Sequence, residues 1–363
     1  MLDMRPHLRK VIKLGRSALA VTLPKEWTSS VKLKEGDYVL IDDAEENCIR
    51  IKKADSEFEV PPDVCVINAD VCTSQNMLWR IIIGAYMVGH KIIWIQSKNG
   101  FKPSDVEGIR ALTEMLVGLH VTEQTDNIII LQSLADPSRP TIDSSIRRLH
   151  LISSSMYEVA LGVLLGEEEP RRLEDIRALG VECDKVYWLV TRQLLLSVND
   201  RALARELGIR SHLWLLGNRA VVRMLKSIVT DSKYICRYVE NLLKLGYRPD
   251  IETSRWFANV RDEVRSISNT AIDSLITKDL VGGNNTIESA NKLARVLEAA
   301  EMSAPKKFDV NVCPSLSGIV RSLRNIVLNY RYIAEVAINR SVEESGEYVS
   351  IDTGGFEERA VNL

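Results

Sequence analysis

Apolar and polar residues alternate along the first 54 residues in the manner of short β-strands. The apolar positions form two runs on either side of LGRSA: Val11, Ile12 and Leu14, then Leu19, Val21 and Leu23. Pro24 suits the first turn of a helix, and GDYVLIDDAEENCIRIKK predicts a hairpin with DDAEEN as its acidic loop. Strands of this length bury little apolar surface, so we expect residues 1–54 to fold with a partner chain.

Between residues 58 and 138 the pattern alternates between short apolar runs and amphipathic ones. We expect strands at VCVINA, KIIWIQ, HVTEQ and IIILQSL. We expect helices at SQNMLWRIIIGAYMVG, which ends at Gly89, and at PSDVEGIRALTEMLVG, with Ser104 as N-cap and Gly118 near its end. The β-α-β-α-β-β order predicts a small α/β domain whose helices pack on one face of the sheet.

Residues 142–345 have apolar positions three and four apart throughout, which predicts an all-helical region of six helices. The stretch RMLKSIVTDSKYICRYVEN, residues 223–241, aligns without a gap to RSLRNIVLNYRYIAEVAIN, residues 321–339, with seven identities. This repeat predicts two copies of a three-helix bundle, each ending in its own version of the helix. Residues 346–363 are acidic and weakly apolar, and we expect them to be disordered.

Composition excludes several classes of protein. The 363 residues are 45% hydrophobic and 26% charged, and no apolar run is long enough to span a bilayer, so we expect a cytoplasmic protein without membrane insertion. The six cysteines are scattered, which favours reduced thiols over disulfides or a zinc site. No phosphate-binding glycine loop or nucleophile motif is present. We therefore expect neither an enzyme nor a bound cofactor or metal.

Charge is unevenly distributed along the N-terminal segment. Residues 1–34 hold eight Lys or Arg against two acids, and residues 35–59 are acidic. Such a basic segment on a protein of net charge −2 indicates contact with a polyanion. An ordinary solvated strand face is the alternative interpretation.

The stretches LGRSALAVTLPKEW and LKEGDYVLI resemble the SpoVT/AbrB swapped-hairpin domain. In that family two chains interlace their strands into one small β-barrel and present basic side chains to DNA. The resemblance implies a homodimer that binds DNA. It identifies five candidate contacts: Arg9, Lys10, Lys13, Arg16 and Lys25.

The helical region resembles PhoU, a phosphate-uptake regulator built from two three-helix bundles. The resemblance lies in SLRNIVLNYRYIAEVAIN and in ECDKVYWLVTRQLL. A hairpin module joined to such a region through a small α/β domain is similar to the archaeal PhoU regulators. The resemblance implies a role in phosphate homeostasis, and it adds a phosphate-transporter ATPase as a candidate partner.

One feature departs from PhoU, whose E(D)xxxD motifs bind metal clusters. In the duplicated helix those positions hold Lys226 and Thr230 in the first copy, and Arg324 and Leu328 in the second. A cationic stripe replaces the metal face: Lys226, Thr230, Lys233 and Arg237, with Arg324 and Arg331 in the second copy. Three explanations of the stripe are possible: carboxylate partners within the chain such as Glu182, Asp184 or Glu335, a site for phosphate or a phosphorylated metabolite, or a docking face for a protein.

These observations predict a multidomain protein with an N-terminal swapped-hairpin barrel, a small α/β domain and paired helical bundles. The predicted function is a DNA-binding transcriptional regulator of phosphate uptake, whose bundles sense a ligand or partner. The alternative is an adaptor that regulates a phosphate transporter by protein contact and uses the hairpin domain only to dimerise.

Overall fold

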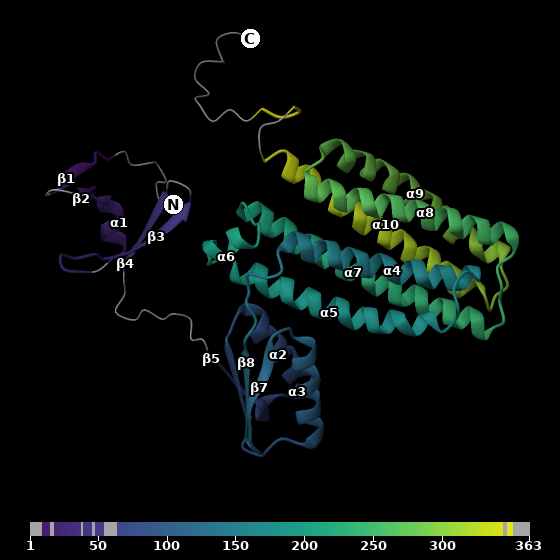
Figure 1. Ribbon diagram of the computed structural model, residues 1–363, viewed down its shortest axis with the longest axis horizontal. Helices are drawn as coiled ribbons and strands as arrows, with labels where there is room; N and C mark the ends of the chain where they lie inside the picture. Colours follow the sequence, from purple (N-terminus) through teal and green to yellow (C-terminus); the bar gives the residue numbers. More distant parts are fainter. Residues whose placement is uncertain are drawn as a thin grey trace, which may run out of the picture. The chain divides into compact units, whose positions relative to one another are not determined.

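The computed structural model describes residues 9–14, 18–37, 39–45, 48–53, 64–343 and 347–350. The chain divides into two compact units, Met1–Pro62 and Asp63–Leu363. It is mostly helical, with a small sheet region (Figure 1). No helix of the described residues combines the length and apolar character that a membrane span requires.

The first unit contains two short hairpins and one helix. Strand β1 (Ile12–Leu14) pairs antiparallel with β2 (Ala18–Ala20), and β3 (Val39–Glu45) pairs antiparallel with β4 (Cys48–Lys53). Helix α1 (Lys25–Ser30) follows Pro24 as expected. The described residues of this single chain form no closed barrel. Strand β3 continues through Glu45, into the segment predicted as the acidic loop.

The second unit begins with the α/β region, which has the expected order of strands and helices. Its elements are β5 (Val64–Asn68), the 3-10 turn η1 (Ala69–Val71), α2 (Gln75–Val88), β6 (Ile92–Gln96), α3 (Pro103–Met115), β7 (Leu119–Gln124) and β8 (Ile128–Ser133). The strand order is β5-β6-β8-β7, with β5 and β6 parallel and the other pairs antiparallel.

The two helices of this region share one apolar core with the sheet. Ile67, Ile93 and Ile129 from the strands join Ile82 and Ile109 from the helices in that core. The predicted N-cap of α3 was wrong. The helix begins with Pro103, and Asp105 accepts a hydrogen bond from the Lys102 backbone N–H at 3.1 Å. Proline at the first helical position makes Lys102 the N-cap, two residues before Ser104.

Seven helices of the described residues complete the second unit, including the six that periodicity predicts. They are α4 (Ile142–Leu165), α5 (Arg172–Leu196), α6 (Arg201–Glu206), α7 (His212–Lys244), α8 (Ile251–Thr277), α9 (Leu280–Lys307) and α10 (Cys313–Ser341). The long helices form two triplets, α4/α5/α7 and α8/α9/α10, which lie side by side (Figure 1). The duplicated helices α7 and α10 pack against each other, and α4 packs against α8.

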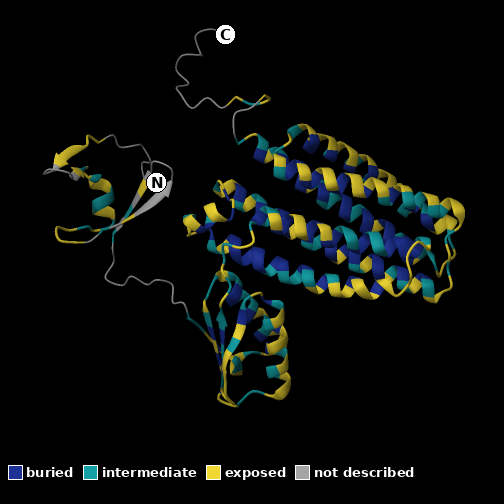
Figure 2. Cartoon of the chain, in the orientation of Figure 1, coloured by how far each residue is buried: buried dark blue, intermediate teal, exposed yellow. Residues whose placement is uncertain are grey.

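The core explains why the repeat preserves its apolar residues. Leu225 and Leu323, Ile228 and Ile326, and Ile235 and Ile333 are equivalent in the two copies, and all six are fully buried. They belong to a single core that runs through both triplets, seen as the dark blue interior in Figure 2. Apolar burial at about 25 cal/mol per Å² makes this shared core the main source of stability.

The α/β region is held to the helices by an arginine. Arg192 of α5 is buried, and it donates hydrogen bonds to the backbone carbonyls of Tyr86, Gly89 and His90, where α2 ends. Its guanidinium also lies 4.7 Å from the centre of the Tyr86 ring. Carbonyls at a helix C-terminus lack partners within the helix, so Arg192 satisfies them and complements their negative partial charge.

Candidate functional site

Four of the five candidate DNA contacts lie among the described residues, and all four are exposed. Arg9 and Lys10 precede β1, Lys13 lies within β1, and Lys25 begins α1. None of the four forms an ion pair with a described carboxylate. Arg16 lies outside the described residues. These four cations are exposed to solvent, as contact with a polyanion would require.

The apolar side chains of the same unit are also accessible. Six of them are between 46% and 74% exposed: Val11, Ile12, Leu19, Val21, Ile41 and Ile49. Of the residues before Val64 whose burial the structure describes, none is buried. Apolar side chains exposed to this extent are suited to being covered by another surface.

The LKEGD segment forms a tight turn between α1 and β3. Gly36 has a φ of 88°, which favours glycine, and the Asp37 carboxylate accepts a hydrogen bond from the Lys34 backbone N–H at 2.9 Å. The Lys53 ammonium of β4 lies 3.1 Å from the same carboxylate. The Lys34 hydrogen bond and then Lys53 lower the pKa of Asp37. This motif fixes the backbone of the unit and leaves the candidate DNA contacts on other segments.

The first half of the cationic stripe lies on α7 and faces α5. Lys226 forms an ion pair with Asp184, and both side chains are less than a quarter exposed. Burial lowers the pKa of Lys226. The stem of Lys233 packs over Gly180, where a Cβ atom would overlap it. The Thr230 hydroxyl donates to the Lys226 carbonyl, and the exposed Arg237 lies over the Tyr234 ring.

The second half of the stripe repeats this arrangement on α10, facing α9. Arg324 lies 3.5 Å from a carboxylate oxygen of Glu298 and 3.6 Å from one of Glu301. Arg331 donates a hydrogen bond to Asn291 and pairs with Glu335 on its own helix at 3.4 Å. The duplicated helix therefore directs its cations at a neighbouring helix in both copies. Anion binding by the stripe stays a prediction. Within the stripe, Lys233 and Arg237 are the best candidates to contact an anion.

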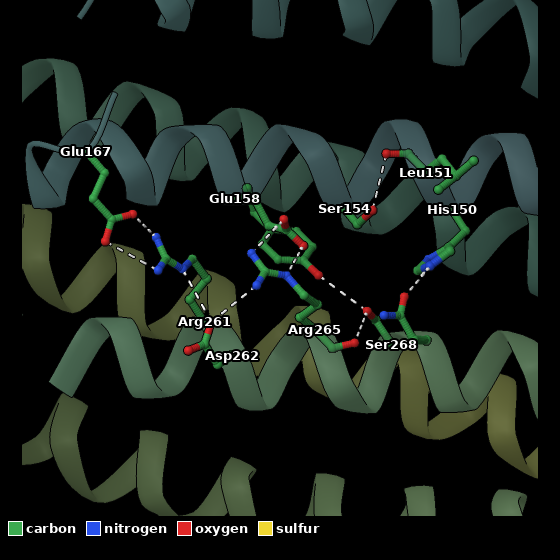
Figure 3. A network of polar contacts seen from close by, with 11 residues as sticks. His150, Leu151, Ser154, Glu158, Glu167, Arg261, Asp262, Arg265 and Ser268 are labelled. Carbon is green, nitrogen blue, oxygen red and sulfur yellow. Dashed lines mark hydrogen bonds and ion pairs between the residues drawn. The ribbon is translucent and has the colours of Figure 1, made fainter. Parts of the chain in front are cut away.

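Polar contacts also join the two triplets along α4 and α8 (Figure 3). Glu158 accepts two hydrogen bonds from Arg265, at 3.1 and 2.9 Å, and Glu167 pairs with Arg261. Further along, the buried His150 lies 3.1 Å from the Asn269 amide oxygen. The described residues contain no group of three or more His, Cys, Asp or Glu side chains arranged to hold a metal ion.

At the edge of the sheet where the parallel strands end, the polar groups form hydrogen bonds with one another. Asp70 follows β5 and accepts hydrogen bonds from the Ser97 hydroxyl and the Lys98 backbone N–H, each at 2.7 Å, and from the Asn99 amide. The Lys98 and Ser97 hydrogen bonds lower the pKa of Asp70. Ligands usually bind α/β sheets at this edge. Here Asp70 instead ties together the loops that follow β5 and β6.

Comparison with known proteins gives little beyond this geometry. No family model matches the chain, and no curated protein matches it. Among solved structures, the chain is similar to PhoU from Pseudomonas aeruginosa, with 15% sequence identity and a TM-score of 0.43, over 54% of this chain and 93% of that chain.

Proposed function

We propose that this chain is a homodimeric, DNA-binding transcriptional regulator of phosphate uptake and phosphate homeostasis. In this proposal the first unit binds DNA, and the helical region senses a ligand or a partner protein. One observation carries the DNA-binding part: among its described residues, the first unit combines exposed cations with exposed apolar side chains on and beside its short strands.

A second copy of the chain would account for both features. Pairing of two first units would cover apolar side chains such as Ile41 and Ile49, which are more than half exposed in one chain. It would also double the number of cations on one surface, which strengthens binding to a phosphate backbone. The resemblance of LGRSALAVTLPKEW to swapped-hairpin domains supports the same arrangement.

The phosphate part of the proposal is supported by the helical region. Its sequence resembles PhoU, and its duplicated helices α7 and α10, one from each triplet, pack against each other. Regulation requires that a ligand or partner bind two states of the protein with different affinity. Such a ligand would alter DNA affinity by changing the arrangement of the first units of the two chains.

Charge reversal tests DNA binding. Lys13→Glu combined with Arg16→Glu should abolish retention of promoter DNA at low salt, measured by fluorescence anisotropy. The logarithmic salt slope of any remaining binding should fall by about 0.9 for each DNA phosphate that the variant no longer neutralises. The matched control is Lys98→Glu with Lys102→Glu, which reverses two exposed cations of the α/β region.

The result also separates the two candidate functions. DNA retention that disappears in the Lys13/Arg16 variant and persists in the control supports the regulator. Equal retention by both variants and the unmodified chain would favour the adaptor, in which the first unit serves only dimerisation. In that case, pull-down of the ATPase subunit of a phosphate transporter would be the next measurement.

A further inference from the structure

The β5-β6-β8-β7 sheet of the α/β region has helices on one face only. Successive side chains of a strand point to opposite faces. On the face that packs against α2 and α3, five side chains of β5, β6 and β8 are buried: Ile67, Ile93, Ile95, Ile129 and Leu131. Six apolar side chains of the same strands join neither apolar core of the described residues: Val64, Val66, Ile92, Trp94, Ile128 and Ile130. They lie on the other side of the sheet, which no described helix of the second unit covers and which we call the open face (Figure 1).

Strand pairing brings the apolar side chains of the open face together. Val66 of β5 lies opposite Trp94 of β6, and Trp94 lies opposite Ile130 of β8. Side chains opposite one another on one face of a sheet are within contact range, so these three form a continuous row. Val66 is 58% exposed and Trp94 is 37% exposed. The open-face residues of β5, β6 and β8 carry no charge, and Glu123 of β7 lies opposite Ile130 at the rim.

The chemistry of the open face suits a second copy of the same chain. Exposed apolar patches with a polar rim mark interaction sites, and large aromatic residues such as Trp94 are enriched at the centres of protein interfaces. When two identical faces meet, an uncharged face avoids the repulsion that like charges would cause. A charged partner, by contrast, would find no group of opposite charge among the open-face residues of β5, β6 and β8.

The size of the open face limits what it can hold. Four strands about 4.8 Å apart, with about five residues each at about 3.3 Å per residue, give a face of about 300 Å². Two such faces would bury about 600 Å², which is about half of the 1,200 Å² or so that a stable independent interface needs. The contact is therefore too small to hold two free chains together. It fits two chains that are already joined elsewhere.

The first unit supplies such a connection in the proposed dimer. Strand β4 ends at Lys53 and β5 begins at Val64, so only residues 54–63 separate the first unit from the sheet. Ten residues span at most about 36 Å, and paired first units would therefore keep the two open faces close to each other. A short tether raises the effective concentration to about the millimolar range. At that concentration a contact forms that free chains would not maintain.

We propose that the open faces of the two chains pack against each other within the dimer, with Trp94 of each copy near the twofold axis. The inference rests on pairing of the first units, which is part of the proposed function, for its tether. The contact would join the α/β regions of the two copies directly. Because Arg192 fixes α2 to α5, a ligand or partner that shifts the helices would change this contact and, with it, the arrangement of the first units.

Sedimentation equilibrium of the full chain, without DNA, tests the proposal. Trp94→Gln should raise the dissociation constant of the dimer by about tenfold or more, because each copy loses the central aromatic side chain of the contact. The matched control is Ile81→Gln on α2, which is equally exposed, at 36%, and should leave the dissociation constant unchanged. Val66→Gln alters the same row at a more exposed side chain and should raise the dissociation constant by about threefold or more. Circular dichroism checks that each variant is folded.

A charge exchange tests whether the partner is a second copy of the same face. Trp94→Lys and Trp94→Glu chains, co-expressed with one of the two isotopically labelled, should form heterodimers well above the half expected from random pairing, because opposite charges then meet near the axis. Native mass spectrometry counts the three dimers. The corresponding pair at Ile81 should give random pairing.

Two outcomes would overturn the inference alone. They are a dimer whose dissociation constant is the same in the unmodified chain, Trp94→Gln and Val66→Gln, and random pairing of the Trp94→Lys and Trp94→Glu chains. Either result would leave the DNA-binding proposal standing, because DNA retention is measured separately. An unmodified chain that stays monomeric would overturn both this inference and the homodimer of the proposed function.

Discussion

Lys226 on α7 and Arg324 on α10 occupy equivalent positions of the duplicated helix, and each pairs with a carboxylate on a neighbouring helix of its own triplet. Lys226 pairs with Asp184 of α5, whereas Arg324 lies between Glu298 and Glu301 of α9. The two pairings differ in burial. Asp184 is 23% exposed and Glu298 is 61% exposed. The ion pair at this position should therefore contribute differently to the free energy of unfolding in the two copies.

This difference gives the first prediction. Asp184→Asn should lower the free energy of unfolding by about 1–3 kcal/mol, because it leaves the Lys226 ammonium partly buried without a counter-charge. Glu298→Gln should change it by less than about 0.5 kcal/mol, because the side chain is solvated and Glu301 remains beside Arg324. Urea denaturation measures both. Equal decreases in the two variants would contradict the asymmetry.

The second prediction concerns Arg192, which joins α5 to the end of α2. Arg192→Met keeps much of the side-chain volume and removes the hydrogen bonds to the carbonyls of Tyr86, Gly89 and His90. The free energy of unfolding should fall by about 2–3 kcal/mol, because buried carbonyls lose a charged donor. Hydrogen exchange of the His90 amide, which donates to the Ala85 carbonyl, should quicken.

Arg177→Met is the matched control for this change, since Arg177 lies on the same helix but is 73% exposed in its pair with Glu240. It should cost less than about 0.5 kcal/mol and leave exchange at His90 unaltered. Unchanged exchange at His90 in the Arg192 variant would show that the α/β region is held by its apolar contacts alone.

The long helices were predictable because their apolar positions repeat over many turns, but some of their limits were not. Helix α9 begins at Leu280 and continues through Gly282 and Gly283, which are poor helix formers. Asp279 caps this turn by accepting from the Gly282 N–H at 3.0 Å, and Gly283 fits closely against α10. The six-residue α6 is too short to show a period.

Contacts between segments far apart in the sequence were harder to predict. Helical spacing placed Lys226 and Lys233 on one stripe, and Asp184 was among the carboxylates expected to pair with it, but the packing of Lys233 over Gly180 is identified only by the fold. A cavity at the end of the helical region where α4 and α7 begin combines Asp143, Arg210 and Lys278, which no sequence window contains. In the first unit, alternation placed Ile12, Leu14 and Leu19 on strands, whereas Val11, Val21 and Leu23 lie outside them. It could not show that Ile12 and Leu19 are exposed, because alternation does not identify what covers a strand face.

The third prediction concerns pH and His150, which is 6% exposed between α4, α8 and α10. Its Nδ1 lies 3.1 Å from the Tyr330 hydroxyl, and its Nε2 lies 3.1 Å from Asn269. Burial lowers its pKa below the usual 6.5, although Asn269, Asp273 and Glu158 raise it in part and Arg147 lowers it further. The unfolded chain therefore binds a proton at a pH where the folded chain does not.

The sign of the effect follows from this difference. The contribution of uncharged His150 to the free energy of unfolding is fully present above about pH 6.5. It is lost as the pH falls toward the lowered pKa of His150 in the folded state. The free energy of unfolding should therefore decrease between about pH 6.5 and 5, and this decrease should be smaller in His150→Gln. Denaturation at several pH values measures it. His120→Gln, at an exposed position, is the control, and a pH slope in His150→Gln equal to that of the unmodified chain would rule out His150 as the cause.

The fourth prediction tests whether a second copy of the chain covers the exposed strands of the first unit. Ile41 and Ile49 are 57% and 58% exposed, and burying an isoleucine contributes about 1.5–3 kcal/mol. Ile41→Ser with Ile49→Ser should therefore weaken self-association by about 2 kcal/mol or more, a factor of about 30 in the dissociation constant. Sedimentation equilibrium measures the change. Met302→Ser with Val310→Ser removes two apolar side chains that are 77% and 79% exposed on the helical region, and it should leave association unchanged. A dimer that is weakened equally by both variants would mean that the chains associate through the helices, and the first unit would then need another surface to bury its strands.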